Sequence, residues 1–172
     1  MKTFISACTI ALMATSSFAG DWTAGYAGLG VGYGDVDLSA GLPGGNNSIY
    51  GIHGGYDYDM GDWVIGSELE YARTNIDVGN GASTLDNVFS LKVKFGYDFG
   101  PALGYALVGG TRAYTNNIGN DTGGLYGLGL AYQVNPQWTI SGEYVRHYFD
   151  DFNNSGIDVD ADAVSLRASF RF

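Results

Sequence analysis

The sequence predicts an all-β protein, an eight-stranded antiparallel up-and-down transmembrane β-barrel. Three observations support this class: a final strand with one apolar and one polar face, short and long connections that alternate along the chain, and an export signal at the amino terminus. The final strand alternates Val164, Leu166, Ala168, Phe170 and Phe172 with Ser165, Arg167, Ser169 and Arg171. Successive side chains of a strand point to opposite faces, so one face suits lipid and the other suits a polar lumen.

The chain begins with a predicted signal peptide, residues 1–19. Lys2 precedes an apolar run, and the small residues Ser17 and Ala19 have the spacing of a signal peptidase site, so we expect cleavage after Ala19. The apolar run is shorter than the ~20 residues that cross a bilayer, which disfavours an amino-terminal membrane anchor. Residues 20–172 are the predicted barrel domain, and Cys8, the single cysteine, is lost with the signal.

The composition favours strands and argues against nucleic-acid binding. The 172 residues include 28 Gly, 13 Tyr and 9 Phe but only 3 Pro, a balance typical of strands and turns. The formal net charge is −10, and loss of Lys2 leaves 7 basic against 18 acidic residues, or −11. Because nucleic-acid binding needs a cationic surface, we expect no such partner. At about 10 residues per spanning strand, the mature chain accommodates about eight strands.

Four strands are expected in the first half of the chain, each with mostly apolar or aromatic residues at every second position. The residues predicted to face lipid are Ala27, Leu29, Val31 and Tyr33; Tyr50, Ile52, Gly54, Tyr56 and Tyr58; Trp63, Ile65, Ser67, Leu69 and Tyr71; and Phe89, Leu91, Val93, Phe95, Tyr97 and Phe99. The opposite faces are rich in glycine and charged residues, which suits a polar lumen.

Three further strands precede the final one. The residues predicted to face lipid are Leu103, Tyr105 and Leu107; Leu128, Leu130, Tyr132 and Val134; and Trp138, Ile140, Gly142 and Tyr144. In the first of these strands, the assignment puts Gly110 and Arg112 on the lumen side. Because the bilayer offers no water to a free strand edge, the first strand is expected to pair with the last.

The connections alternate in length. Tight turns are expected at 59–62, 100–101 and 135–137, and longer polar segments at 34–48, 73–85, 115–123 and 149–161. Short turns at one end and long loops at the other follow the plan of bacterial outer-membrane barrels, with both termini periplasmic. Aromatic residues beside the short turns and the carboxyl terminus are typical of an interfacial girdle; they are Trp63, Tyr97, Phe99, Trp138, Phe170 and Phe172.

Eight charged side chains fall on the predicted lumen face. They are Glu68, Glu70, Lys92, Lys94, Arg112, Glu143, Arg167 and Arg171. Buried charges are tolerated when they are paired and hydrogen-bonded, and an eight-stranded barrel has room for side chains and little else. The primary interpretation is a salt-bridged plug that fixes the strand register. The alternative is a narrow gated conduit whose ion pairs rearrange.

No catalytic, cofactor or metal site is predicted. His53 and His147 have no neighbouring serine and carboxylate in a recognised catalytic arrangement. The segment that begins at Asp158 starts like an EF-hand loop, but Ala163 replaces the required glycine and Ser169 the distal glutamate. Solvated acidic loops are the favoured interpretation, and divalent cations that bridge these carboxylates to lipopolysaccharide are the alternative.

Several segments resemble one bacterial family. The stretches 124–132, 135–144 and 148–150, the opening 22–34 and the closing 170–172 are similar to the porin-family, OmpA-like outer-membrane β-barrel proteins of alphaproteobacteria. The resemblance spans the whole mature chain and implies a barrel more than an activity. One departure is Ala131, where relatives often carry an acidic residue.

The carboxyl terminus also resembles the signal read by the outer-membrane assembly machinery. The residues concerned are Leu166, Ala168, Phe170 and Phe172. A simple girdle role for Phe172 is compatible with this one.

We therefore expect an integral protein of the Gram-negative cell outer membrane, with a mainly structural role and loops available for adhesion or other surface contacts. Its expected partners are outer-membrane lipid, lipopolysaccharide, the β-barrel assembly machinery and host or surface ligands. A narrow small-solute porin is one alternative. A periplasmic lipocalin-like binder is another, since Gly20, Asp21 and Trp22 faintly match the opening of that family; such a binder keeps its apolar face inward.

Overall fold

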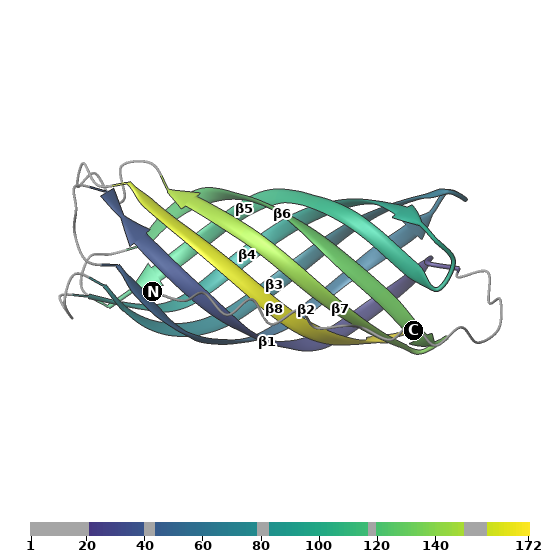
Figure 1. Ribbon diagram of the computed structural model, residues 1–172, viewed down its shortest axis with the longest axis horizontal. Coiled ribbons are helices and arrows are strands. Elements are labelled where there is room, and N and C mark those ends of the chain that lie inside the picture. The colour runs from purple at the N-terminus through teal and green to yellow at the C-terminus, as the bar shows by residue number, and fades with distance from the viewer. Residues whose placement is uncertain (1–20, 40–43, 79–82, 117–119, 150–157) are drawn as a thin grey trace, which may run out of the picture.

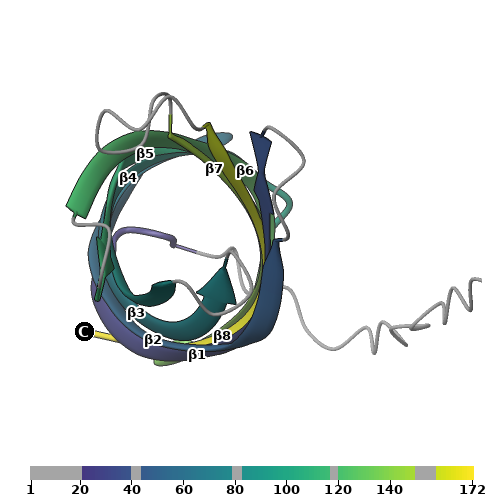
Figure 2. The same cartoon turned by 90° about the vertical axis from the view of Figure 1, so that its left-hand side faces the viewer.

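The protein is a closed barrel of eight antiparallel strands (Figures 1 and 2). The computed structural model describes residues 21–39, 44–78, 83–116, 120–149 and 158–172. The strands are β1 (Ala24–Leu38), β2 (Gly45–Asp59), β3 (Trp63–Val78), β4 (Ser83–Asp98), β5 (Ala102–Thr115), β6 (Asn120–Asn135), β7 (Trp138–Phe149) and β8 (Val159–Arg171). The predicted fold class is confirmed. The proposed signal peptide lies outside the described residues.

Each strand pairs with its neighbours in sequence, and β1 pairs with β8 to close the cylinder. The closing ladder runs from Tyr26 opposite Arg171 to Leu38 opposite Val159. Closure satisfies the backbone groups that a free edge would expose. No helix in the described ranges is long and apolar enough to cross a membrane.

The barrel is polar inside and apolar outside over most of its height. Leu130 is 69% exposed on the outer face, whereas Lys92 is 2% exposed inside the lumen. Along β4, outward Phe89, Leu91 and Val93 are exposed and inward Lys92 is buried. This arrangement is the reverse of a water-soluble binding barrel, which keeps its apolar face inward, so the lipocalin-like alternative is wrong.

Strand β5 corrects one prediction. Leu103, Tyr105 and Leu107 point into the lumen and are buried, and Arg112 lies on the outer face. The large inward side chains fill space over inward glycines of the neighbouring strands. A Cβ placed on Gly129 would lie 2.2 Å from the Tyr105 ring. Lumen filling by large side chains thus decides the orientation of this strand.

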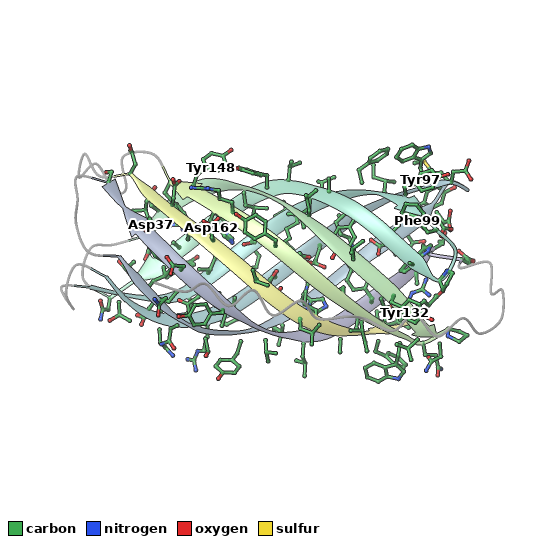
Figure 3. The ribbon with its side chains drawn as sticks, in the orientation of Figure 1. Asp37, Tyr97, Phe99, Tyr132, Tyr148 and Asp162 are labelled. Carbon is green, nitrogen blue, oxygen red and sulfur yellow. The ribbon has the colours of Figure 1, made fainter. Side chains whose placement is uncertain are left out.

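The connections alternate in length as predicted, but the bounds of the long segments are corrected: the strands extend into them, and the connections shorten to residues 39–44, 79–82, 116–119 and 150–158. Gly61 and Gly100 adopt positive φ, 101° and 85°, in two of the short turns, a conformation that glycine accommodates without strain. Aromatic rings gather on the outer face beside these turns: the Trp63 ring stacks on Phe95 at 4.9 Å, and the Trp138 and Phe170 rings are 5.4 Å apart. Figure 3 shows Tyr97, Phe99 and Tyr132 at this end and Asp37, Tyr148 and Asp162 at the other.

Candidate functional site: an ion cluster across the lumen

Five charged residues, four buried and one half-buried (Glu70), meet near the middle of the lumen; we call Glu68, Glu70, Lys92, Glu143 and Arg167 the lumen ion cluster. The Lys92 ammonium lies 2.6 Å from a Glu143 oxygen and 3.4 Å from a Glu68 oxygen, and it also donates to Glu70. The Arg167 guanidinium lies 2.6 Å from Glu68 and pairs through its other terminal nitrogen with Glu143. Each cation therefore contacts more than one carboxylate.

The strand register brings these groups together from opposite walls. Glu68 on β3 is directly opposite Lys92 on β4. On β7, Glu143 is two residues along the same face from Ser141, which lies opposite Arg167 on β8. Arg167 then reaches Glu68, 99 residues earlier in the chain. The cluster consequently links β3–β4 to β7–β8 across the interior.

Two tyrosines complete the hydrogen bonding of the carboxylates. The Tyr26 hydroxyl donates to Glu68 at 2.9 Å, and the Tyr105 hydroxyl donates to Glu143 at 3.1 Å. Charged groups in a low-dielectric interior need such additional donors. Neither tyrosine is predicted from the sequence as a partner of the cluster. Tyr105 is assigned there to the lipid-facing side of its strand, and Tyr26, which lies on the same inward face of β1 as Gly28, is omitted.

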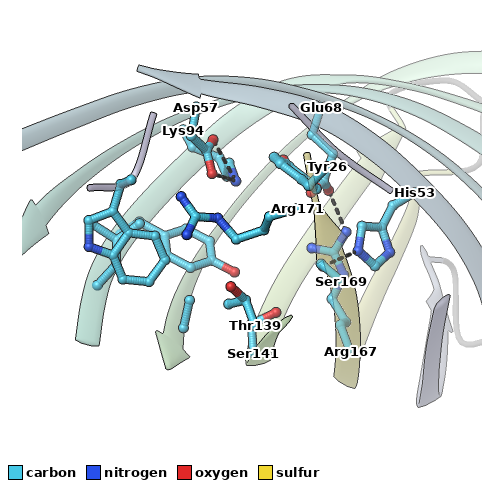
Figure 4. Close-up of a pocket in the computed structure, with 14 residues that line it drawn as sticks. Tyr26, His53, Asp57, Glu68, Lys94, Thr139, Ser141, Arg167, Ser169 and Arg171 are labelled. Atoms are coloured by element: carbon cyan, nitrogen blue, oxygen red, sulfur yellow. Dashed lines mark hydrogen bonds and ion pairs between the residues drawn. The ribbon is translucent and has the colours of Figure 1, made fainter. Parts of the chain in front are cut away.

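Two more of the predicted lumen cations, Lys94 and Arg171, lie closer than the cluster to the short-turn end along β4 and β8, and Figure 4 shows their side chains. Lys94 pairs with Asp57 at 2.9 Å and lies over the Tyr26 ring at 4.5 Å. The Arg171 guanidinium donates to the Asp21 carbonyl at 2.7 Å and lies 5.6 Å from the Trp22 ring. Asp57 is buried on the lumen face of β2 and is not part of the predicted charge network.

Arg112 does not belong with these residues. It is exposed on the outer face, and its guanidinium lies 5.6 Å from the Tyr114 ring. Its predicted position in the lumen network is wrong because β5 presents the opposite face.

The cluster divides the lumen. A cavity of about 30 Å³ on the short-turn side is lined in part by Glu68 and Arg167, and one of about 70 Å³ on the long-connection side is lined in part by Lys92 and Glu143. The second cavity is largely apolar, with Val36, Ile76 and other aliphatic side chains around it.

The site offers limited chemistry beyond ion pairing. Oxygens of Glu68, Glu70 and Glu143 lie within 4.8 Å of one another, a spacing that would suit a metal ion, but Lys92 and Arg167 already pair with these carboxylates. The His53 Nε2 lies 2.8 Å from the Ser169 hydroxyl, as a base and nucleophile would. The His53 and Ser169 pair is enclosed in the lumen, and its position does not indicate a substrate.

The fold and the outward apolar surface define an integral membrane β-barrel. The chain belongs to the family described as outer membrane protein beta-barrel domain, whose model matches residues 4–172. The protein is therefore an integral β-barrel of the outer membrane, and lipid and lipopolysaccharide form its surroundings.

Relatives agree with this membership. The 31 kDa outer-membrane immunogenic proteins of Brucella melitensis biotype 1 and Brucella suis biovar 1 are each 25% identical, with 99% of this chain and 95% of the relative covered. Neisserial surface protein A matches with a TM-score of 0.63 at 18% identity, covering 86% of this chain and 97% of that one. Ail of Yersinia pestis matches with a TM-score of 0.56 at 17% identity, covering 87% and 99%. These two structures show the shared fold.

Proposed function

We propose that this barrel is a sealed structural element of the outer membrane that presents its long connections at the cell surface, and that it neither conducts solutes nor catalyses a reaction. The observation that carries the proposal is the lumen ion cluster, which joins opposite walls through buried pairs. Removing an ion-pair partner from such a site leaves a charge both desolvated and uncompensated, at a cost of about 3–5 kcal/mol. Rearrangement to open a path is therefore costly.

Purified protein in planar lipid bilayers is expected to give no steady conductance. The matched comparison is the double variant Lys92→Ala and Glu143→Ala, which removes a cation and an anion at once and enlarges the space between the two cavities. A small conductance in the variant alone would support a sealed native lumen. Stepwise conductance from the native protein would instead support the narrow-porin alternative.

The proposed surface role depends on the long-connection end. One structure of Ail contains the heparin analogue sucrose octasulfate. The outer rim of the present barrel is acidic where β1 meets β8, because Asp35 faces Asp162 and Asp37 faces Asp160. This rim disfavours a polyanion and favours a cationic partner or one bridged by divalent cations. Replacing residues 150–157 with a Gly–Ser segment of equal length should abolish attachment to host cells or matrix; unchanged attachment would contradict this role.

We also propose that Leu166, Ala168, Phe170 and Phe172 are read by the assembly machinery. The Phe172 side chain is 78% exposed and its backbone amide donates to the Gly25 carbonyl at 2.9 Å, so the terminal ring is available beside the closing seam. Phe172→Ala is expected to lower the amount inserted in the outer membrane several-fold in cells while refolding in detergent is unchanged. Val164→Ala, on the same face of β8, is the control. Equal insertion of both variants would contradict the signal role.

A further inference from the structure

We propose that Arg73 and Arg112 form a binding site for the phosphate groups of lipopolysaccharide on the outer face of β3–β5. The proposal rests on the outer-membrane location and on the charges of this face. It does not depend on whether the lumen is closed.

These two arginines differ from every other cation in the described ranges. Lys92, Lys94 and Arg167 pair with carboxylates inside the barrel, and Arg146 pairs on the rim with Asp160 at 3.2 Å. Arg171 donates to backbone carbonyls. Arg73 and Arg112 are exposed and have no ion pair with the residues that the structure describes. Two exposed guanidinium groups without a carboxylate partner on one face favour binding of an anion from the surroundings.

Both residues lie where the apolar outer surface ends. Arg112 is opposite Phe89 on β4 and opposite Thr122 on β6, and Arg73 is opposite Asn87. Below this level the outward residues of β4 are apolar, including Leu91 and Val93. This end carries the long connections, which are extracellular in outer-membrane barrels. The two guanidinium groups are therefore at the level of the outer-leaflet headgroups.

The geometry suits a phosphorylated headgroup. Arg73 and Arg112 are on strands two apart and two residues out of register, because Asn87 lies opposite both Arg73 and Tyr114; their backbones are about 12 Å apart at the usual strand spacing and rise. Guanidinium groups bind phosphate through paired charge-assisted hydrogen bonds. Tyr114 lies beside the Arg112 guanidinium at 5.6 Å, and the Tyr71 hydroxyl donates to Asn87 at 2.8 Å between the two arginines. Polar side chains thus flank both cations.

The surface directly below Arg112 can accept an acyl chain. The outward face of β5 is shallow at Ala106 and Gly110 and apolar at Val108 between them, and a Cβ added to Gly110 would meet nothing within 4 Å. The neighbouring outward residues are larger, such as Leu91 beside Gly110 and Leu128 beside Ala106. A lipid bound by its phosphate at Arg112 would find apolar walls along its chain.

The opposite side of the rim provides the contrast. Arg146 on β7 is held by Asp160 and Asp162, and Asp35 and Asp37 follow on β1. A phosphate would be repelled there. The proposed site is therefore confined to β3–β5, and Arg146 supplies a matched control for loss of one rim arginine.

The test measures binding of purified lipid A to the detergent-solubilised full-length mature protein by native mass spectrometry, with dephosphorylated lipid A as the second ligand. The variants are Arg73→Gln, Arg112→Gln and their double, with Arg146→Gln as the charge control. Gly110→Leu fills the surface below Arg112, and Gly142→Leu, another outward glycine with open space around it on β7, is its control. Heat-modifiable gel migration verifies that each variant is folded.

Loss of one charge-assisted contact is expected to weaken lipid A binding about tenfold in Arg112→Gln, and the double variant should bind dephosphorylated and phosphorylated lipid A alike. Arg146→Gln and Gly142→Leu should bind as the native protein does, and Gly110→Leu should bind less. Equal binding by the native protein of the two lipids, or equal losses in Arg112→Gln and Arg146→Gln, would overturn the proposal. A protein dimer abolished by Gly110→Leu would assign this face to a second copy instead and would also overturn it.

Discussion

Replacing Arg167 with leucine is expected to lower the free energy of unfolding of the barrel by about 3–5 kcal/mol, the usual cost of leaving a buried charge without its partner. Arg167 donates to Glu68 and Glu143 through its two terminal nitrogens and so joins β8 to both β3 and β7. Its loss leaves three carboxylates around the single ammonium of Lys92. Water has little access there, since Glu68 and Glu143 are 2% and 3% exposed.

The measurement is equilibrium unfolding in lipid vesicles by urea, followed by the fluorescence of the three tryptophans. Arg146→Leu is the control, because it also removes a paired arginine, but from an exposed rim where ion pairs contribute about 0–1 kcal/mol. Equal losses of unfolding free energy in the two variants would show that burial does not increase the contribution of Arg167 to stability. That result would contradict the proposed structural role of the cluster.

Most of the architecture could be predicted from the sequence because lipid on one side and polar contacts on the other impose a period of two. Strands such as β4, with Phe89 and Leu91 outward and Lys92 inward, carry that signal strongly. Strand β5 does not. In its first half the outward residues Gly104 and Ala106 are small and the inward residues Leu103, Tyr105 and Leu107 are large, so alternation gives the right strand with the wrong face. The deciding fact, that Tyr105 fills space over Gly129, is a contact between strands and cannot be read from either strand alone.

The same limit applies to the site. Alternation correctly predicts that Glu68, Lys92, Glu143 and Arg167 face the lumen. Which of them pair depends on the strand register and on the position of each residue along the barrel axis. Arg167 meets Glu68 although β8 and β3 are not neighbours in the sheet. The Asp57 to Lys94 pair likewise joins β2 to β4 over the intervening β3. Such contacts through the interior have no local sequence signal.

Removing Glu143 together with Arg167 is expected to restore much of the stability lost in the single variant. The double variant Arg167→Leu and Glu143→Leu keeps Glu68, Glu70 and Lys92, so the cluster retains the native net charge of −1 while two charges are replaced by apolar groups. Replacing a buried ion pair with hydrophobic residues is often neutral, whereas removing one partner is not. A double-mutant cycle should therefore give a coupling energy of about 2–3 kcal/mol between positions 143 and 167.

The comparison for this cycle is Arg167→Leu with Asp57→Asn, which removes a lumen carboxylate that pairs with Lys94 and has no bond to Arg167. This pair should show a smaller coupling energy, because loss of Asp57 leaves Lys94 unpaired without relieving Glu68 or Glu143. If the coupling energy between Arg167 and Glu143 is no larger than that between Arg167 and Asp57, the stability of the barrel depends only on the total charge of the lumen. A larger coupling energy between Arg167 and Glu143 would mean that the specific ion pairs of Arg167 hold the walls of the barrel together, as a plug that fixes the strand register requires.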